Sequence, residues 1–298
     1  MALVMFGFMF WGPKKDIVPE TDTESAPTES PVSVAALDSL SPNEQQWLVR
    51  NITDHGTAVM LADSTRAFRY SDKNVDLVAS GNKVTGTVNV DGKMIDWQDV
   101  VAEDLSKMTM AQQRKAIELV RQASTDIARF GKFAPFLAGN DTIVKIENDV
   151  LSLQLSSKSG SITRAELKDY YTEYTPDESK NRKENVVLFE NGTDAFSFLI
   201  PLAQEISTSD LYFDPQIVND STILMKLPVA DDAYWGIEYT LPRGKNYVVG
   251  MRVVQKNMTQ VIESNNRNLG IDWSQRLIRQ EKGKMFEERN SGLYYKYE

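Results

Sequence analysis

The chain has 298 residues, enough for one large domain or two modest ones. Its 33 basic and 42 acidic residues give a net charge of −9, which disfavours binding to the phosphate backbone of nucleic acids. The absence of Cys excludes disulfides, thiolate metal sites and cysteine nucleophiles, and a single His leaves almost no imidazole chemistry.

The first residues are apolar. Residues 2–11 read ALVMFGFMFW, and Lys14 and Lys15 follow. Ten helical residues rise about 15 Å, which is half of the hydrocarbon core of a bilayer. Because Trp11 and the two lysines suit a membrane interface, we interpret residues 1–12 as a truncated N-terminal membrane anchor whose natural start lies upstream. A short apolar terminus packed on its own domain and a monotopic anchor are the alternatives.

Residues 13–40 have the composition of a solvated linker. They are rich in Pro, Ser, Thr and Glu, and residues 16–31 contain five acids and no base. Such a segment buries too little apolar surface to offset its ordering entropy. We expect an acidic tether between a membrane and a folded domain.

Residues 41–138 show mixed helix and strand signals. Ser41 with Glu44 and Thr109 with Gln112 form capping boxes at the start of two predicted helices, which end at Gly56 and Gly131. Between them, alternating residues from Val84 to Val90 lead to Asp91-Gly92, a type I′ hairpin signal, with residues 94–97 as the return strand. The pattern predicts a small α+β insertion.

From residue 139 onward the apolar period changes to two. Alternating apolar residues predict strands at 151–155, 196–202, 223–229, 235–241 and 247–253. Several half-buried strands joined by short turns favour a mainly β antiparallel sandwich over residues 139–298. Residues 293–297 predict a further strand with an exposed edge, and we expect the natural protein to continue beyond it.

The sandwich region resembles a known family. Residues 149–162, DVLSLQLSSKSGSI, with Ala165, Leu167 and Tyr170, resemble the start of the large periplasmic domain of the YidC family of bacterial membrane protein insertases. The family has a Gly-Gly turn where this chain has Ser159-Gly160, and Gly160 keeps the residue suited to positive φ. Further segments resemble the Bacteroidetes-type version of that domain, namely 212–215, 239–242, 272–276, 279–284 and 291–295. The resemblance is weaker over residues 41–138.

The resemblance implies a partial antiparallel β-supersandwich, similar to the fold of aldose epimerases and other sugar-binding proteins. It implies that insertion activity resides in a C-terminal bundle of spanning helices. After residue 12 this chain has no apolar run near the ~20 residues that cross a bilayer. We therefore expect an N-terminal fragment of an insertase and chaperone that lacks the insertase core.

The same resemblance implies where the protein is and what it meets. The location is the bacterial inner membrane, with the folded domain in the periplasm. The partners are nascent membrane proteins, Sec translocon components, and the inner membrane itself through the N-terminal helix. The alternative function is a membrane-tethered carbohydrate-binding sandwich that uses exposed aromatic rings.

The residues offer no catalytic site. His55 lies at the end of a capped helix, where a structural role is expected, so we predict no enzyme activity and no metal or cofactor. Residues 86–93 superficially resemble a phosphate loop but have the wrong spacing and sit in a hairpin. The acidic pairs Asp231-Asp232 and Glu287-Glu288 are interpreted as solvated turns.

One basic cluster remains a candidate contact site. It comprises Arg276, Arg279, Lys282, Lys284 and Arg289, interleaved with acidic residues. A surface ladder of weak ion pairs and a contact with anionic headgroups or a protein partner are both open. Tyr234, Trp235, Tyr239 and Tyr247 are expected in the sandwich core rather than on a ligand platform.

Overall fold

The computed structural model describes residues 39–173, 184–190, 192, 194–262, 268–276, 279–280 and 282–292. The expected membrane anchor, most of the expected linker and the expected strand at 293–297 lie outside the described residues. Within the described part, every helix is too short or too polar to cross a bilayer.

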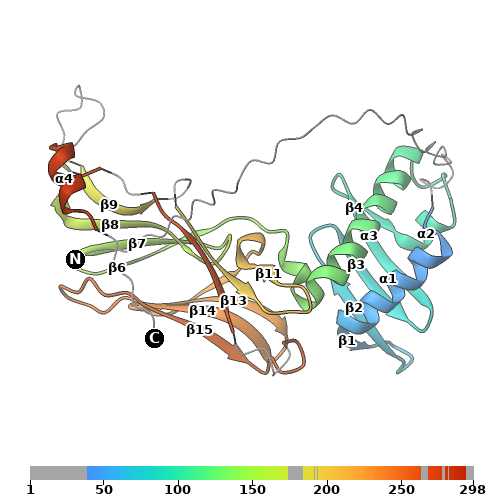
Figure 1. Ribbon diagram of the computed structural model, residues 1–298. Helices are drawn as coiled ribbons and strands as arrows, with labels where there is room; N and C mark the ends of the chain where they lie inside the picture. The colour runs from blue at the N-terminus through green and yellow to red at the C-terminus, as the bar shows by residue number, and fades with distance from the viewer. Residues whose placement is uncertain are drawn as a thin grey trace, which may run out of the picture.

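The N-terminal part is a five-stranded antiparallel sheet with helices on one face (Figure 1). The strands follow one another in space as in sequence, and the two long helices α1 and α3 pack against the sheet and each other. The elements are α1 (Pro42–His55), β1 (Thr57–Met60), β2 (Arg66–Ser71), β3 (Val75–Ser80), β4 (Lys83–Val90), β5 (Lys93–Asp96), α2 (Trp97–Val101), α3 (Met110–Phe130) and the 3₁₀ helix η2 (Gly131–Phe136).

Local signals set the ends of the two long helices. Both predicted capping boxes are present, and both helices stop where a glycine was predicted to stop them. The helix residues that face the sheet are buried, among them Leu48, Ile52 and Val120. The hairpin turn is confirmed too, because Asp91 and Gly92 both have positive φ, at 53° and 84°.

The predicted return strand at 94–97 is wrong at its end. β5 stops at Asp96, whose carboxylate accepts a hydrogen bond from the backbone N–H of Gln98 at 2.8 Å. Asp96 is thus the N-cap of α2, so Trp97 begins a helix and is buried there.

The second part is mainly β, as expected. One four-stranded antiparallel sheet contains β6 (Ile143–Glu147), β7 (Leu151–Ser156), β8 (Ile162–Tyr171) and β9 (Asn185–Glu190). A second contains β12 (Asp214–Asn219), β13 (Thr222–Ala230), β14 (Ala233–Thr240) and β15 (Gly250–Lys256). A three-stranded sheet has the order β11 (Ile206–Ser207), β10 (Ala195–Ile200) and β16 (Gly270–Ser274), and the helical turns are η3 (Thr208–Asp210) and α4 (Lys284–Asn290).

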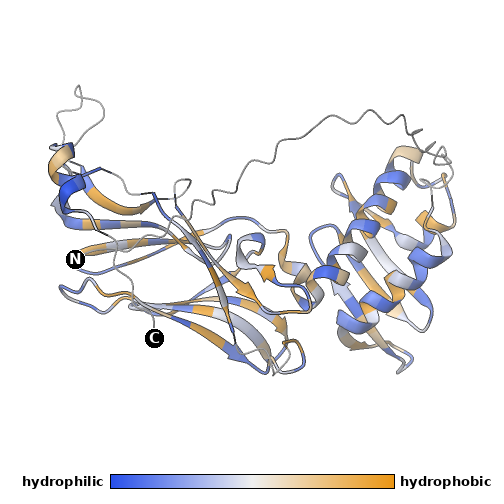
Figure 2. Cartoon of the chain, in the orientation of Figure 1, coloured by the Kyte–Doolittle hydropathy of each residue, from blue (hydrophilic) through white to orange (hydrophobic). Residues whose placement is uncertain are grey.

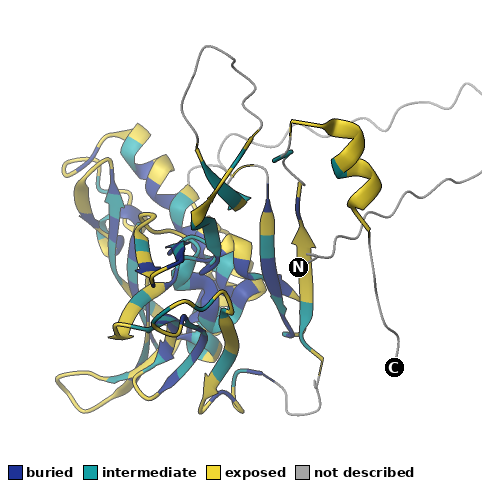
Figure 3. Ribbon diagram, turned by 90° about the vertical axis from the view of Figure 1, so that its left-hand side faces the viewer, coloured by how far each residue is buried: buried dark blue, intermediate teal, exposed yellow. Residues whose placement is uncertain are grey.

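The sheets bury one face each against a shared core. Alternating residues of β7, β13 and β14 are buried, and the alternation is visible along the strands in Figures 2 and 3. Trp235 lies at the centre, with ring centroids 6.0 Å from Phe198 and 6.1 Å from Phe213. β14, β10 and the residue just before β12 therefore meet around aromatic rings, which supply large buried areas.

The Ser159-Gly160 turn has a left-handed backbone. Ser159 and Gly160 both have positive φ, at 69° and 62°. A Cβ added to Gly160 would lie 2.9 Å from the ring of Phe213. The backbone carbonyl oxygen of Gly160 accepts a hydrogen bond from the Tyr239 hydroxyl at 3.0 Å. Glycine is needed here both for conformation and for space.

Candidate interaction surface

The five predicted basic residues lie along one surface segment rather than around a pocket. Arg276 is exposed, and its backbone N–H donates to Asp194 at 2.7 Å. The guanidinium of Arg279 donates to the carbonyl of Lys282. Lys284 pairs with Glu288 one turn later in α4 at 3.5 Å, and Arg289 is exposed in the same helix. The structure thus brings the five residues onto one surface segment, where Lys284 and Glu288 form an exposed ion pair of the kind that contributes little to stability.

This segment is fixed to the edge of β9 by glutamine side chains. Gln275 Nε2 donates to the carbonyl of Leu188 at 2.6 Å, and Gln280 Nε2 donates to that of Val187 at 3.3 Å. The carbonyl of Gln280 accepts hydrogen bonds from Thr172 and Glu173 at the end of β8. The segment thus satisfies backbone groups of an edge strand that would otherwise be open.

Helix α4 presents apolar side chains to solvent between its charges. Met285 and Phe286 are 74% and 69% exposed. The sequence reasoning missed both, although two adjacent apolar residues in a charged run were a visible signal. It was also wrong in placing Glu287-Glu288 in a turn, because they lie in α4.

The four predicted aromatic residues divide into buried and exposed. Trp235 and Tyr239 are core residues, as expected, so they offer no platform to a sugar. Tyr234 is half-buried, with Lys226 Nζ lying 4.8 Å from its ring centroid. The expectation is wrong for Tyr247, which is exposed, because the predicted strand at 247–253 begins only at Gly250.

A long-range clamp explains the position of Tyr247. Asn148 Nδ2 donates to the carbonyls of Pro242 and Asn246, at 2.8 and 2.7 Å, and holds the β14–β15 connection as a loop. Tyr247 then packs edge-on against Tyr170, with ring centroids 6.1 Å apart. Partial loss of hydration, together with the neighbouring Tyr170 hydroxyl and Asp169 carboxylate, raises the pKa of Tyr247.

The residues considered for chemistry have structural surroundings. His55 ends α1 beside Gly131, and burial lowers its pKa. Residues 86–93 form the β4–β5 hairpin, as predicted. Asp231-Asp232 sits in the β13–β14 turn, where Asn257 Nδ2 donates to the Asp232 carboxylate at 2.8 Å. Among the described residues, no three acidic or His side chains cluster as metal ligands do.

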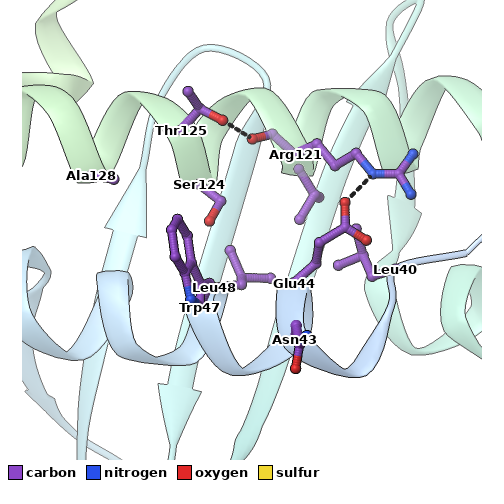
Figure 4. A pocket seen from close by; sticks show the side chains of 10 residues that line it. Leu40, Asn43, Glu44, Trp47, Leu48, Arg121, Ser124, Thr125 and Ala128 are labelled. Carbon is purple, nitrogen blue, oxygen red and sulfur yellow. Dashed lines mark hydrogen bonds and ion pairs between the residues drawn. The ribbon is translucent and has the colours of Figure 1, made fainter. Parts of the chain in front are cut away.

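A groove of about 410 Å³ runs between α1 and α3 (Figure 4). Trp47, Leu48 and Val120 line it, and one ion pair crosses it. Glu44 Oε1 accepts from Arg121 Nε at 2.7 Å, and Glu44 Oε2 accepts from the Ser41 backbone at 2.7 Å. The hydrogen bond from Arg121 is the largest cause that lowers the pKa of Glu44 below 4.5. Because the Glu44 carboxylate and the Arg121 guanidinium pair with each other within the groove wall, the arrangement fits helix packing rather than catalysis.

Glu44→Gln is expected to lower the free energy of unfolding at pH 7. A carboxylate with a lowered folded pKa stabilises the native state above its unfolded pKa, and this contribution is lost as the pH falls through the folded value. The difference between variant and wild type should therefore shrink below pH 4.5. Urea titrations of both proteins at several pH values measure this difference in the free energy of unfolding. Glu118→Gln, which removes an exposed carboxylate of α3, is the control, and an equal pH dependence in both variants would contradict the assignment.

Comparison with known proteins identifies relatives over part of their length. The chain is 32% identical over 171 residues to the membrane protein insertase YidC of Parabacteroides distasonis, covering 56% of this chain and 26% of the relative. It is 30% identical over 203 residues to YidC of Porphyromonas gingivalis, covering 67% and 31%. It is 23% identical over 227 residues to YidC of Prosthecochloris aestuarii, covering 70% and 38%. No protein-family profile and no solved structure matches.

These similarities confirm the resemblance seen in the sequence. The chain is homologous to YidC membrane protein insertases, and it spans between about a quarter and two fifths of the length of these three relatives. Insertion of a protein into a membrane makes and breaks no covalent bond, so the relatives agree with the expectation that the chain is not an enzyme.

Proposed function

We propose that this chain is the periplasmic part of a YidC-type insertase and chaperone, which assists the insertion and folding of inner-membrane proteins. The observation that carries the proposal is the homology over 171 to 203 residues to membrane protein insertases. The place of this chain is the inner membrane, with the folded domain in the periplasm.

We divide the chain accordingly. Residues 1–12 are the membrane anchor, 13–40 the linker, 41–138 the α+β insertion, and 139–298 the supersandwich. The change from helix-covered sheet to facing sheets near residue 139 supports the boundary. The paired sheets around Trp235 support the supersandwich.

The proposed partners are nascent membrane proteins and Sec translocon components. β16 supports capture by strand addition, because within the described residues it pairs only with β10. Ile271 and Trp273 of β16 are exposed beside this open edge. A client segment in extended conformation would form main-chain hydrogen bonds with β16, and its side chains would pack against Ile271 and Trp273. The basic segment Arg276–Arg289 is a second contact.

Photo-crosslinking tests this function. A photoreactive amino acid replaces Trp273, and the whole chain is mixed with a ribosome-stalled, single-span nascent membrane protein. We expect crosslinks from position 273. We expect none from position 60, which lies on β1, an edge strand of the N-terminal five-stranded sheet. Equal crosslinking from both positions, or none from either, would exclude β16 as a client-binding edge. Binding to a glycan array would instead support the carbohydrate-binding alternative.

A further inference from the structure

One end of the sandwich, remote from the N-terminal sheet, carries a group of exposed aromatic and apolar side chains. They come from the end of β8, the β14–β15 loop and α4, which all belong to that end of the sandwich, with α4 at its top in Figure 1. The six residues are Tyr170, Tyr171, Tyr247, Val248, Met285 and Phe286, and we call them the apolar end. Clustered exposed apolar residues mark contact sites more often than scattered ones do.

Direct contacts hold the three segments together. The rings of Tyr170 and Tyr247 touch edge to face. Thr172, two residues beyond Tyr170, donates its hydroxyl hydrogen bond to the carbonyl of Gln280 at 3.0 Å. The backbone N–H of Gln280 in turn donates to Glu287 of α4 at 3.0 Å. The apolar end is therefore presented by a fixed scaffold, and Figure 3, which faces it, shows α4 almost wholly exposed.

The charges of the segment that carries α4 favour an anionic partner. Residues 275–290 contain five basic and three acidic residues, in a chain whose net charge is −9. Within the described residues, Lys282 and Arg289 have no carboxylate partner, and neither does Lys245, two residues before Tyr247. Glu287 and Glu288 are already engaged, by the backbone of Gln280 and by Lys284.

We propose that the apolar end is the surface by which this domain rests on a lipid bilayer with anionic headgroups. Tyrosine rings suit the headgroup level, and apolar side chains flanked by Lys and Arg are the pattern of segments that lie in a membrane interface. Phe286 and Met285 enter the acyl boundary, while Lys282, Arg289 and Lys245 meet the phosphates. This inference rests on the proposed function, because the proposed function places the periplasmic domain next to the inner membrane.

Single cysteines test the contact, since these 298 residues contain none. Phe286→Cys and Tyr247→Cys carry an environment-sensitive dye, and the full chain is added to vesicles of equimolar phosphatidylcholine and phosphatidylglycerol. We expect blue-shifted emission and quenching by spin-labelled lipids at both positions. Met60→Cys, on β1, is the control and should show neither. Because each dye reports its own position, anchoring through residues 2–11 alone would leave both dyes in water and overturn the proposal.

A pair of double variants gives an independent readout. Met285→Ser with Phe286→Ser should weaken vesicle binding roughly tenfold, since two apolar side chains that the bilayer would partly bury are lost. Met60→Ser with Trp47→Ser is the matched control, because those side chains are each 67% exposed, and it should bind as wild type does. Equal binding by the two double variants would overturn the proposal. The vesicle assay contains no client protein, so a negative result in it is distinct from a negative result in the crosslinking experiment.

Discussion

Trp235→Ala is expected to lower the free energy of unfolding of the sandwich by about 3–5 kcal/mol. The side chain is fully buried, and it contacts rings from two other strands or turns, at Phe198 and Phe213. Its removal leaves a cavity at the point where the sheets meet, and surrounding rings can fill such a space only in part. Since small domains are stable by about 5–15 kcal/mol, this loss is a large part of the total.

Urea denaturation followed by circular dichroism measures the effect. Trp273→Ala is the matched control, because Trp273 belongs to the same row of rings, 6.0 Å from Phe196, but is 48% exposed. We expect it to cost about 1 kcal/mol. Trp235→Phe should also cost less than alanine, because the indole N–H has no acceptor among the described residues and its loss breaks no hydrogen bond. Equal midpoints for the two alanine variants would contradict the central position of Trp235.

The parts of the fold that could be predicted depend on local physics. Capping boxes at Ser41 and Thr109 and the turn at Asp91-Gly92 need only neighbouring residues, and all are present. β2 could not be predicted in this way. It buries Ala67 and Tyr70, which are three residues apart, so its buried residues do not alternate.

The candidate surface was less predictable, because exposure is a property of tertiary structure. The sequence placed Tyr247 in a strand by its spacing, but a clamp from Asn148, almost a hundred residues earlier, holds it in a loop. Met285 and Phe286 are apolar by composition, and only the fold shows that nothing in the described residues covers them. The basic cluster was visible in sequence, whereas the edge of β9 to which it is fixed was not.

Gly86→Ala is expected to lower the free energy of unfolding of the N-terminal sheet by about 2–4 kcal/mol. Gly86 has a φ of 133°, which side chains rarely allow, and it pairs with Leu77 across β3 and β4. A Cβ there would overlap the Asp76 carbonyl oxygen and lie 2.9 Å from the Cα of Leu77. Backbone on the neighbouring strand cannot move aside as a flexible side chain can, so the pairing of β3 with β4 has to open. Gly92→Ala, at a hairpin tip with open space, is the control and should cost about 1 kcal/mol.

The same variant tests whether residues 41–138 are a domain of their own. The two parts touch where the Tyr212 backbone N–H donates to the carbonyl of Phe136 at 2.7 Å, beside Gly139. If this contact couples them only weakly, Gly86→Ala should speed amide hydrogen exchange in β2 to β5 and leave β7, β13 and β14 protected, because exchange reports the opening of each cooperative unit separately. Faster exchange in all of these strands alike would mean that the N-terminal sheet and the sandwich unfold as one unit, and the boundary near residue 139 would then have no thermodynamic meaning.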